Sequence, residues 1–300
     1  MADQPGGSVF HRWEWLSWVA PLLSAKFVPL VVLEGDLPVG IAPMLVRRQW
    51  GLASANVVPF PYLGPVVPAE LISATTSEIL RWARRHGVMS LELCLHPGLP
   101  AVKGSLADAG LNEEQVDTYL IDLVGRDETE LFASLGSDAR TAIRRSVKRG
   151  VTVRTSTAED LRTVLPAVHD ESRGAHSRYS STIGEAVAEG TLPVPTRCAT
   201  AVVDGRPVGV SITLAGPTGA VGWLGATYRT EQHTQANAAL VWDAIVWAAA
   251  KSQQVLDMCG APDPGIAVYK QKFRPRTEQH LVGRWQSPGL ARLHRFRHRP

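Results

Sequence analysis

Cations and aromatic rings alternate in one stretch near the end of the chain, APDPGIAVYKQKFRPR, from Ala261 to Arg276. Its aromatic residues are Tyr269 and Phe273, and its cations are Lys270, Lys272, Arg274 and Arg276. Ammonium and guanidinium groups at this spacing can hold an anionic group or stabilise negative charge that develops on a reacting oxygen. We therefore take the stretch as a candidate site, with a solvated basic surface as the alternative.

A second cationic stretch contains six Lys or Arg residues and no acidic residue between Arg140 and Arg154. Ser137 or Asp138 can cap a helix here and Gly150 can end it. The helical period places Arg140, Arg144 and Lys148 on one face and lets Ile143 and Val147 face the core. The candidate phosphate contacts are Arg140, Arg144, Arg145, Lys148 and Arg149. A basic face that only meets solvent is the alternative.

Further candidates stand singly. Tyr62, bracketed by prolines in PFPYLGP, could line an acceptor site or form a packing corner. Tyr228 and Arg229 follow the predicted strand AVGWLGAT, where a reactive edge could be exposed. Cys94 and Cys259 end apolar strands and are expected in the core, and no spacing of His, Cys and carboxylates indicates a metal site.

Composition narrows the setting of these residues. The chain has 300 residues, of which 45% are hydrophobic, and a net charge of +3, so it can bury a substantial core. Its three cysteines at irregular spacing argue against a disulfide framework. The N-terminal stretch MADQPGGSVF lacks the features of a signal peptide, and no apolar run approaches the roughly 18 residues of a membrane span. We expect a cytoplasmic protein without a membrane span.

An internal repeat organises the chain. The matched hairpin pair is Pro29 to Val46 with Arg197 to Ala215, and the matched pair of a helix and a strand is Ile79 to Cys94 with Ala244 to Cys259. In the second pair Trp82 aligns with Trp247, Glu92 with Asp257, and Cys94 with Cys259. Two copies of one α/β unit are therefore predicted, in residues 1–124 and 125–300, the second with a basic C-terminal tail, GLARLHRFRHRP. The strand from Asp117 to Val124 is expected to close the first copy.

The predicted order of hairpin, strand, helix and strand resembles the GNAT fold of N-acyltransferases. The resemblance implies two tandem GNAT-like units, with mixed sheets flanked by helices, in the α/β (α+β) class. In that fold, backbone N–H groups of a glycine-rich turn cradle the pyrophosphate of coenzyme A at a helix N-terminus. Here the corresponding segment, YRTEQHTQAN, contains Glu231 and no glycine. Coenzyme A is therefore disfavoured.

The whole chain resembles the Fem family of non-ribosomal peptidyltransferases, which join an aminoacyl group from a charged tRNA to an amine. The resemblance rests on the duplicated layout, the basic helix DARTAIRRSVKRG, Asn237 at the start of a helix, and the segment GIAVYKQKF. It implies that Tyr269 and Lys270 take the place of the family's Phe-Lys pair near the reaction centre. Arg274 and Pro275 stand where the family usually has a glycine. The coiled-coil arm of some cell-wall members is absent, which argues against a peptidoglycan acceptor.

The resemblance implies an aminoacyltransferase with aminoacyl-tRNA as co-substrate and without a cofactor or metal. The acceptor is expected to be a small amine or a peptide, in a natural-product pathway. Lys270, assisted by Lys272, would stabilise the oxyanion or meet the tRNA phosphates. The remaining candidates are Tyr269 and Tyr228 for catalysis and Arg274, Tyr62, Arg229 and Asn237 for substrate binding. The alternatives are an acyl-coenzyme A N-acyltransferase and a non-catalytic protein that binds RNA or another polyanion; the oligomeric state is open.

Overall fold

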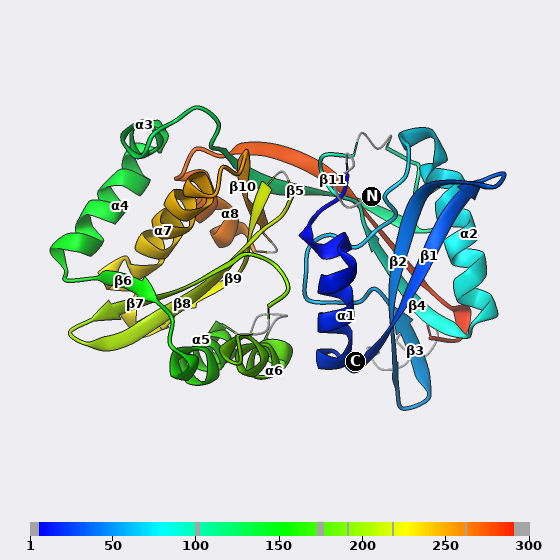
Figure 1. The fold of residues 1–300 in the computed structure, drawn as a ribbon, viewed down its shortest axis with the longest axis horizontal. Coiled ribbons are helices and arrows are strands. Elements are labelled where there is room, and N and C mark those ends of the chain that lie inside the picture. Colours follow the sequence, from blue (N-terminus) through cyan, green and yellow to red (C-terminus); the bar gives the residue numbers. More distant parts are fainter. Residues whose placement is uncertain are drawn as a thin grey trace, which may run out of the picture. The chain divides into compact units, whose positions relative to one another are not determined.

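The computed structural model describes residues 6–99, 103–172, 177–190, 192–217, 219–261 and 263–290 (Figure 1). Most of the predicted basic C-terminal tail lies outside these residues. The fold is mixed α/β, as predicted. The chain forms two compact units. Unit 1 contains the described residues up to Val116 together with those from Gln279 onwards, and unit 2 is Asp117–Glu278.

Unit 1 contains five strands and the helices between them. In chain order the elements are η1 (Val9–His11), α1 (Trp13–Leu22), β1 (Ala25–Glu34), β2 (Leu37–Gln49), β3 (Leu52–Ala55), η2 (Ala69–Leu71), α2 (Ile72–Arg85), β4 (Val88–Cys94) and, from the end of the chain, β11 (Arg276–Gln286). The strand order is β1-β2-β3-β4-β11. Among the strand pairs of the described residues of this unit, only β3/β4 is parallel.

Unit 2 begins within β5 (Asn112–Asp122). It continues through α3 (Glu128–Ser134), α4 (Ser137–Lys148), β6 (Thr152–Thr155), η3 (Asp160–Val164), α5 (Leu165–Ser172), α6 (Ser177–Ala188), β7 (Thr196–Val203), β8 (Arg206–Ala215), β9 (Gly219–Thr227), η4 (Arg229–Thr234), α7 (Ala236–Ala250), β10 (Val255–Gly260) and α8 (Pro264–Gln271). Its strand order is β5-β10-β9-β8-β7-β6. In the described part of this unit only β9/β10 is parallel.

The predicted repeat is present in the strand pairing of both units. A hairpin, β1/β2 or β7/β8, is followed by a third antiparallel strand, β3 or β9. A helix, α2 or α7, then leads to a strand parallel to that third one, β4 or β10. Each hairpin turns at an adjacent glycine and aspartate, with Gly35 and Gly205 at positive φ, as the turn chemistry requires.

The two units exchange their last strands. β5 follows β4 in the chain but pairs with β10, whereas β11 follows β10 and pairs with β4. The expectation that residues from Asp117 close the first copy is therefore wrong. The compact units also differ from the predicted division at residues 124 and 125, because each takes its final strand from the other half of the chain.

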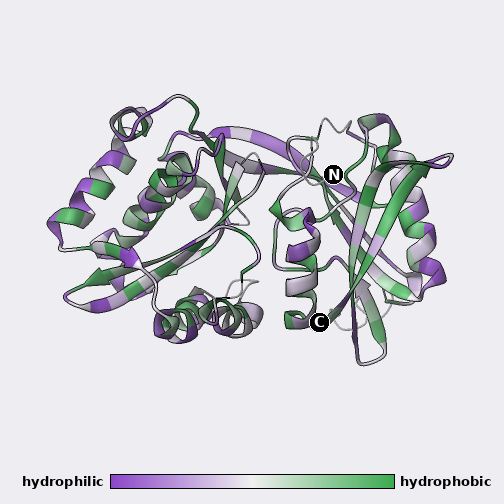
Figure 2. Cartoon of the chain, viewed as in Figure 1, coloured by the Kyte–Doolittle hydropathy of each residue, from purple (hydrophilic) through white to green (hydrophobic). Residues whose placement is uncertain are grey.

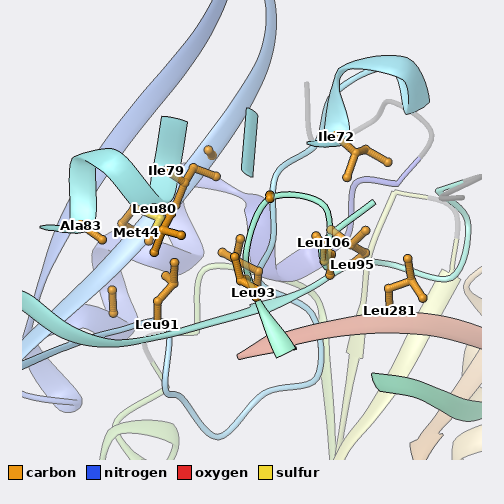
Figure 3. Packing of buried hydrophobic residues seen from close by; sticks show 14 of the residues in the cluster. Met44, Ile72, Ile79, Leu80, Ala83, Leu91, Leu93, Leu95, Leu106 and Leu281 are labelled. Atoms are coloured by element: carbon orange, nitrogen blue, oxygen red, sulfur yellow. The ribbon is translucent and has the colours of Figure 1, made fainter. Parts of the chain in front are cut away.

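The core of unit 1 lies between α2 and the sheet (Figure 3). Ile79 and Leu80 of α2 pack against Leu91 and Leu93 of β4, and Leu281 of β11 joins the same buried cluster. Each such side chain contributes about 1.5–3 kcal/mol when it leaves water. The exchanged strand is thus part of the core of the unit into which it is inserted.

In unit 2, α7 covers the sheet and is itself covered by α4. Figure 2 shows α7 as largely apolar and α4 as banded with polar residues. Ala139, Ile143 and Ser146 form the buried stripe of α4. Val147, expected to face the core, is 69% exposed, because the buried stripe passes from Ile143 to Ser146, three residues on rather than four. The five cationic residues consequently lie outside the buried stripe.

Candidate active site

The parallel strands β9 and β10 diverge inside unit 2. They pair over three positions only, from Gly219 opposite Val255 to Val221 opposite Asp257. Beyond that point β9 continues to Thr227 beside β8. In α/β sheets, ligands bind at the carboxyl ends of parallel strands where neighbouring strands diverge. The end of β10 is therefore the place to look for chemistry.

Asp257 controls how β10 turns there. Its Oδ1 accepts hydrogen bonds from Thr118 Oγ1 and from the backbone N–H of Cys259, both at 2.7 Å. Cys259 has φ +63, and the register with β5 shifts between Asp257 and Gly260. A buried carboxylate that accepts two such bonds holds the local backbone in one conformation. Asp257 is 4% exposed, and the ladder between β9 and β10 ends at this residue, where the bulge against β5 begins.

Lys270, on α8, closes this strand end. Its Nζ donates to the carbonyl oxygens of Met258, Cys259 and Gly260, the last two at 3.0 and 2.7 Å. An ammonium group has three N–H donors, so all three are engaged by the backbone. Burial lowers the pKa of Lys270, and this effect is opposed by Cys259 and Asp257. In this structure Lys270 positions the end of β10.

Cys259 donates its thiol to the carbonyl of Gly222 on β9 at 3.4 Å. Burial raises the pKa of this thiol, with the Asp257 carboxylate acting in the same direction and Lys270 opposing. A protonated, buried thiol is a poor nucleophile. The expectation that Cys259 is a packing residue agrees with this environment.

Tyr269 and Asn237 come together from α8 and α7. Burial raises the pKa of Tyr269, and the neighbouring Asn237 side chain opposes that rise. The hydroxyl is enclosed but makes no hydrogen bond of good geometry, and the ring packs edge-on against Phe273 with centroids 5.5 Å apart. Tyr269 is consequently a neutral phenol at ordinary pH, suited to donate a hydrogen bond and unsuited to act as a base.

The turn between β9 and α7 is a compact 3₁₀ helix, η4, rather than an open loop. Tyr228 precedes it, half-buried, with its backbone N–H on the carbonyl of Val208, and Arg229 is exposed in its first turn. Thr234 Oγ1 accepts from the N–H of Ala236 at 3.2 Å. The N–H of the N-cap residue Gln235 donates to the carbonyl of Gln232, and the N–H of Ala238 donates to the carbonyl of Gln235. Three of the first four N–H donors of α7 are thus used within the protein.

Lys272 and Arg274 follow α8, and both side chains are exposed. The backbone carbonyl of Lys272 lies against Gly136 at the start of α4, so closely that a Cβ at Gly136 would stand 2.2 Å from it. Arg274 has φ +53. It stands where the Fem resemblance expects a glycine, and it adopts the left-handed conformation that glycine adopts most readily.

The cations of α4 divide into two groups. Arg140 Nη1 donates to the carbonyls of Ala133 and Leu135, so it holds the connection between α3 and α4. The Arg144 guanidinium lies 5.1 Å from the centroid of the Phe132 ring and is exposed. Arg145, Lys148 and Arg149 are exposed around the last turn, where cations also oppose the negative end of the helix dipole. A phosphate surface on α4 would use these four residues rather than Arg140.

In unit 1, the place beyond the paired ends of β3 and β4, which corresponds to the strand end of β10, is filled by the segment that contains Tyr62 and Leu63. β3 and β4 pair up to Ala55 opposite Leu91, and beyond them Leu63 bridges to Cys94. Tyr62 is 0% exposed, with its ring edge-on to His96 and His280 at 5.0 and 5.2 Å. Tyr62 is therefore a packing residue, and the expectation that it lines an acceptor site is corrected, because its ring is enclosed by these imidazoles.

Sequence reasoning missed the residues that shape the strand end. Asp257, Thr118 and the carbonyls of residues 258–260 belong to the site geometry. The alignment of Glu92 with Asp257 in the repeat was the available signal, since an acidic residue at an apolar strand end needs a partner. The partner Thr118 lies 139 residues away in the sequence, and its contact with Asp257 depends on the strand exchange.

No described helix is long and apolar enough to cross a membrane.

Comparisons with known proteins agree with this geometry. Residues 135–271 match the model of an acetyltransferase (GNAT) domain. No curated protein sequence matches the chain. The crystal structure of FemX aligns with a TM-score of 0.68 and 14% identity, covering 93% of each chain.

Two further structures are similar. A tandem GNAT protein from the clavulanic acid biosynthesis pathway aligns with a TM-score of 0.59 and 13% identity, over 88% of this chain and 83% of its own. The C-terminal domain of a putative lysylphosphatidylglycerol synthetase from Agrobacterium fabrum aligns with a TM-score of 0.57 and 14% identity, over 92% and 90%. At these identities the similarity establishes the fold. This chain therefore has a GNAT-type acyltransferase fold, built from two tandem units.

Proposed function

We propose that the protein is an aminoacyltransferase that takes an aminoacyl group from aminoacyl-tRNA and forms an amide on a small amine or a peptide. The proposal joins the Fem-like order of sequence motifs to the GNAT-type fold, which aligns with FemX along 93% of each chain. The acceptor is placed in a natural-product pathway, since the chain lacks the coiled-coil arm of some cell-wall members of the Fem family.

The hydrogen bonding at the start of α7 is the observation that favours aminoacyl-tRNA over coenzyme A as the acyl donor. A coenzyme A pyrophosphate needs free backbone N–H groups and close approach of the chain. Here the N–H groups of Gln235, Ala236 and Ala238 are bound by Gln232, Thr234 and Gln235, and η4 presents side chains in place of a glycine-rich turn. An aminoacyl-tRNA donor does not need this cradle, because its phosphates can be met by exposed cations elsewhere.

The reaction needs modest help from the protein, since an aminoacyl ester is already activated. The acceptor nitrogen forms a bond to the ester carbonyl carbon, the bond to the tRNA ribose oxygen breaks, and the proton lost by the amine returns to that oxygen. Orientation and stabilisation of the oxyanion supply most of the acceleration. The protonated Tyr269 hydroxyl beside Asn237 is a suitable hydrogen-bond donor, and Lys270 fixes the adjoining strand end.

The acyl-coenzyme A N-acyltransferase is the second candidate, favoured by the match of residues 135–271 to an acetyltransferase domain model. One experiment separates the two. The protein is incubated with tRNA charged with radiolabelled amino acids, or with acetyl-coenzyme A, each with a panel of amines and peptides. We expect acceptor-dependent loss of label from tRNA. Acceptor-dependent release of free coenzyme A thiol would overturn the proposal.

Binding to tRNA gives an independent measurement. The double variant Arg145→Glu with Lys148→Glu on α4 is expected to weaken tRNA binding at least tenfold and to flatten its salt dependence, because two phosphate contacts are lost. Arg206→Glu, at the exposed turn of the β7/β8 hairpin, is the control. Protection from heat by uncharged tRNA, without turnover of any charged tRNA, would instead support a non-catalytic RNA-binding protein.

A further inference from the structure

A pocket of about 700 Å³ lies in unit 1 between β1 and α2. Its apolar lining includes Leu30, Val32 and Leu33 of β1, Ala42 of β2 and Ile79 of α2. Leu33 is 56% exposed. It belongs to β1, an apolar strand at the edge of its sheet. A pocket of this size and lining suits a flexible hydrocarbon chain.

One end of the pocket is cationic. Arg81, Arg85 and His86, at the C-terminal end of α2, belong to its lining. Arg48 of β2 reaches the same place, since its Nη2 donates to the carbonyl of His86 at 3.1 Å. Arg84, in the same turn of α2, is exposed but lies over the Trp285 ring, 5.4 Å from its centroid, and does not belong to the pocket lining.

The acidic residues of the pocket do not cancel this charge. Glu78 is paired with Arg81. Glu34 is the last residue of β1. The C-terminal end of α2 instead lies near Ala25, the first residue of β1, because Val88 pairs with Ala53 and Ala25 pairs with Arg47. Nine residues of strand separate the two ends, about 30 Å. The guanidinium groups of Arg48 and Arg85 thus form a net positive mouth beside an apolar interior.

Trp50 projects from the same end of unit 1. It occupies the turn between β2 and β3 with φ +50 and is 91% exposed, directly after Arg47 and Arg48. Leu52, on the other side of the turn, is 39% exposed. An indole so exposed contributes nothing to the core. Tryptophan beside basic residues is a typical anchor at the interface between water and lipid headgroups.

We propose that this end of unit 1 binds an anionic phospholipid of a membrane surface. An acyl chain lies along Leu30, Val32 and Ile79, the phosphate meets Arg48 and Arg85, and the Trp50 indole enters the headgroup layer. Most of the apolar lining is aliphatic, and the Trp82 ring within it is already stacked on His86, with centroids 4.8 Å apart. This favours an acyl chain over RNA, because unpaired bases stack on open aromatic rings. The inference goes beyond the proposed function and does not depend on it.

The test is sedimentation of the full chain with vesicles. Vesicles of phosphatidylcholine mixed with phosphatidylglycerol are compared with vesicles of phosphatidylcholine alone. We expect binding to the anionic vesicles only. Arg48→Glu with Arg85→Glu should weaken it at least tenfold, and Trp50→Ala should weaken it severalfold. Ser77→Trp, which fills the pocket from α2, should lower it while circular dichroism shows the fold retained.

Matched control variants distinguish binding at this surface from non-specific electrostatic attraction of the protein to anionic vesicles. Arg145→Glu with Lys148→Glu changes the net charge equally on unit 2, and Trp13→Ala removes another exposed tryptophan, 61% accessible on α1. Both should leave vesicle binding unchanged. Equal loss in the two charge-reversal variants would overturn the proposal, as would absence of binding to anionic vesicles. Loss of tRNA affinity in Trp50→Ala, with vesicle binding intact, would assign the surface to RNA and overturn it as well.

Discussion

At the scale of residues, the ammonium group of Lys270 determines the shape of the candidate site. The last carbonyls of β10 leave the sheet ladder, and buried carbonyls without a donor cost about 1–3 kcal/mol each. Lys270 supplies three donors to them. Lys272, two residues on, projects into solvent. Two lysines in one motif therefore act differently, and the contrast provides a matched pair for mutation.

Lys270→Met keeps the length of the side chain but removes its donors. We expect loss of most turnover and a decrease of about 2 kcal/mol in the free energy of unfolding, because the carbonyls of residues 258–260 lose their partner. Urea denaturation and the charged-tRNA assay measure the two effects. Lys272→Met should change neither by much. A Lys270→Met protein with normal rates would remove Lys270 from the site.

The buried imidazoles of unit 1 make its stability depend on pH. Burial, together with the nearby His280 imidazole, lowers the pKa of His96 to about 4. Burial, together with the nearby His96 imidazole, lowers the pKa of His11 to about 3. In the unfolded chain both groups protonate near 6.5. The unfolded state therefore binds more protons as pH falls from about 6.5 towards 4, and folding stability decreases over that window.

His96→Gln should flatten this dependence between pH 6.5 and 4, when the free energy of unfolding is measured by denaturation at each pH. The exposed His233→Gln is the control and should leave the slope unchanged. A slope that is identical in the His96 variant would show that the imidazole does not remain neutral in the folded protein.

Side-chain direction limited what the sequence could predict at this scale. The alternation of cations and aromatics located α8, and the match of Asn237 to a helix start was correct. Whether Lys270 faces a substrate or a strand end depends on the register of α8 against β10, and the local pattern does not contain that register. Tyr62 was ambiguous for the same reason, and its two imidazole neighbours settle it as a packing residue.

At the scale of elements, the turn between α8 and β11 contains a residue in a conformation that its side chain disfavours. Arg274 has φ +53, which costs an ordinary residue roughly 1–2 kcal/mol. Arg274→Gly should raise the free energy of unfolding by up to about 1 kcal/mol, after the greater entropy of glycine in the unfolded chain is counted. Arg274→Ala removes the charge but keeps the strain, so it should bring no such gain in a urea titration. Equal stabilities of the two variants would contradict this account.

Periodicity located the hairpins, α2, α4 and α7 because each carries a regular apolar pattern. It failed on the outward side of α4, where Val147 is apolar and exposed. Pattern alone cannot distinguish a core position from an apolar surface residue when both lie within one turn of the buried stripe. The turn before α7 was predicted to lack a phosphate cradle, and its closure by Thr234 and Gln235 supplies the geometry behind that expectation.

At the scale of the whole molecule, the repeat was visible in the sequence but the exchange of strands was not. β5 and β11 each carry one run of four consecutive buried residues, 118–121 and 280–283, so the local patterns do not distinguish the two pairings and the choice depends on tertiary packing. The pairing observed places Leu281, near the end of the chain, in the core of unit 1 (Figure 3).

Leu281→Ala tests this placement. We expect a loss of about 2–5 kcal/mol, as for other buried leucines, together with faster hydrogen exchange along β4. Exchange along β8, in the core of unit 2, should change less. Arg206→Ala, on the exposed hairpin turn of unit 2, is the control. Preferential deprotection of β8 would contradict the observed pairing.

The exchange also has a consequence for biosynthesis. A ribosome releases the residues of β4 long before those of β11, so the nascent first half carries an open strand edge while most of the remaining chain is being made. Open edges recruit other strands, and slow completion of long-range pairs exposes a chain to aggregation. This protein therefore finishes its earliest-made unit last, and a stop codon that removed only the final strand would damage the opposite end of the chain.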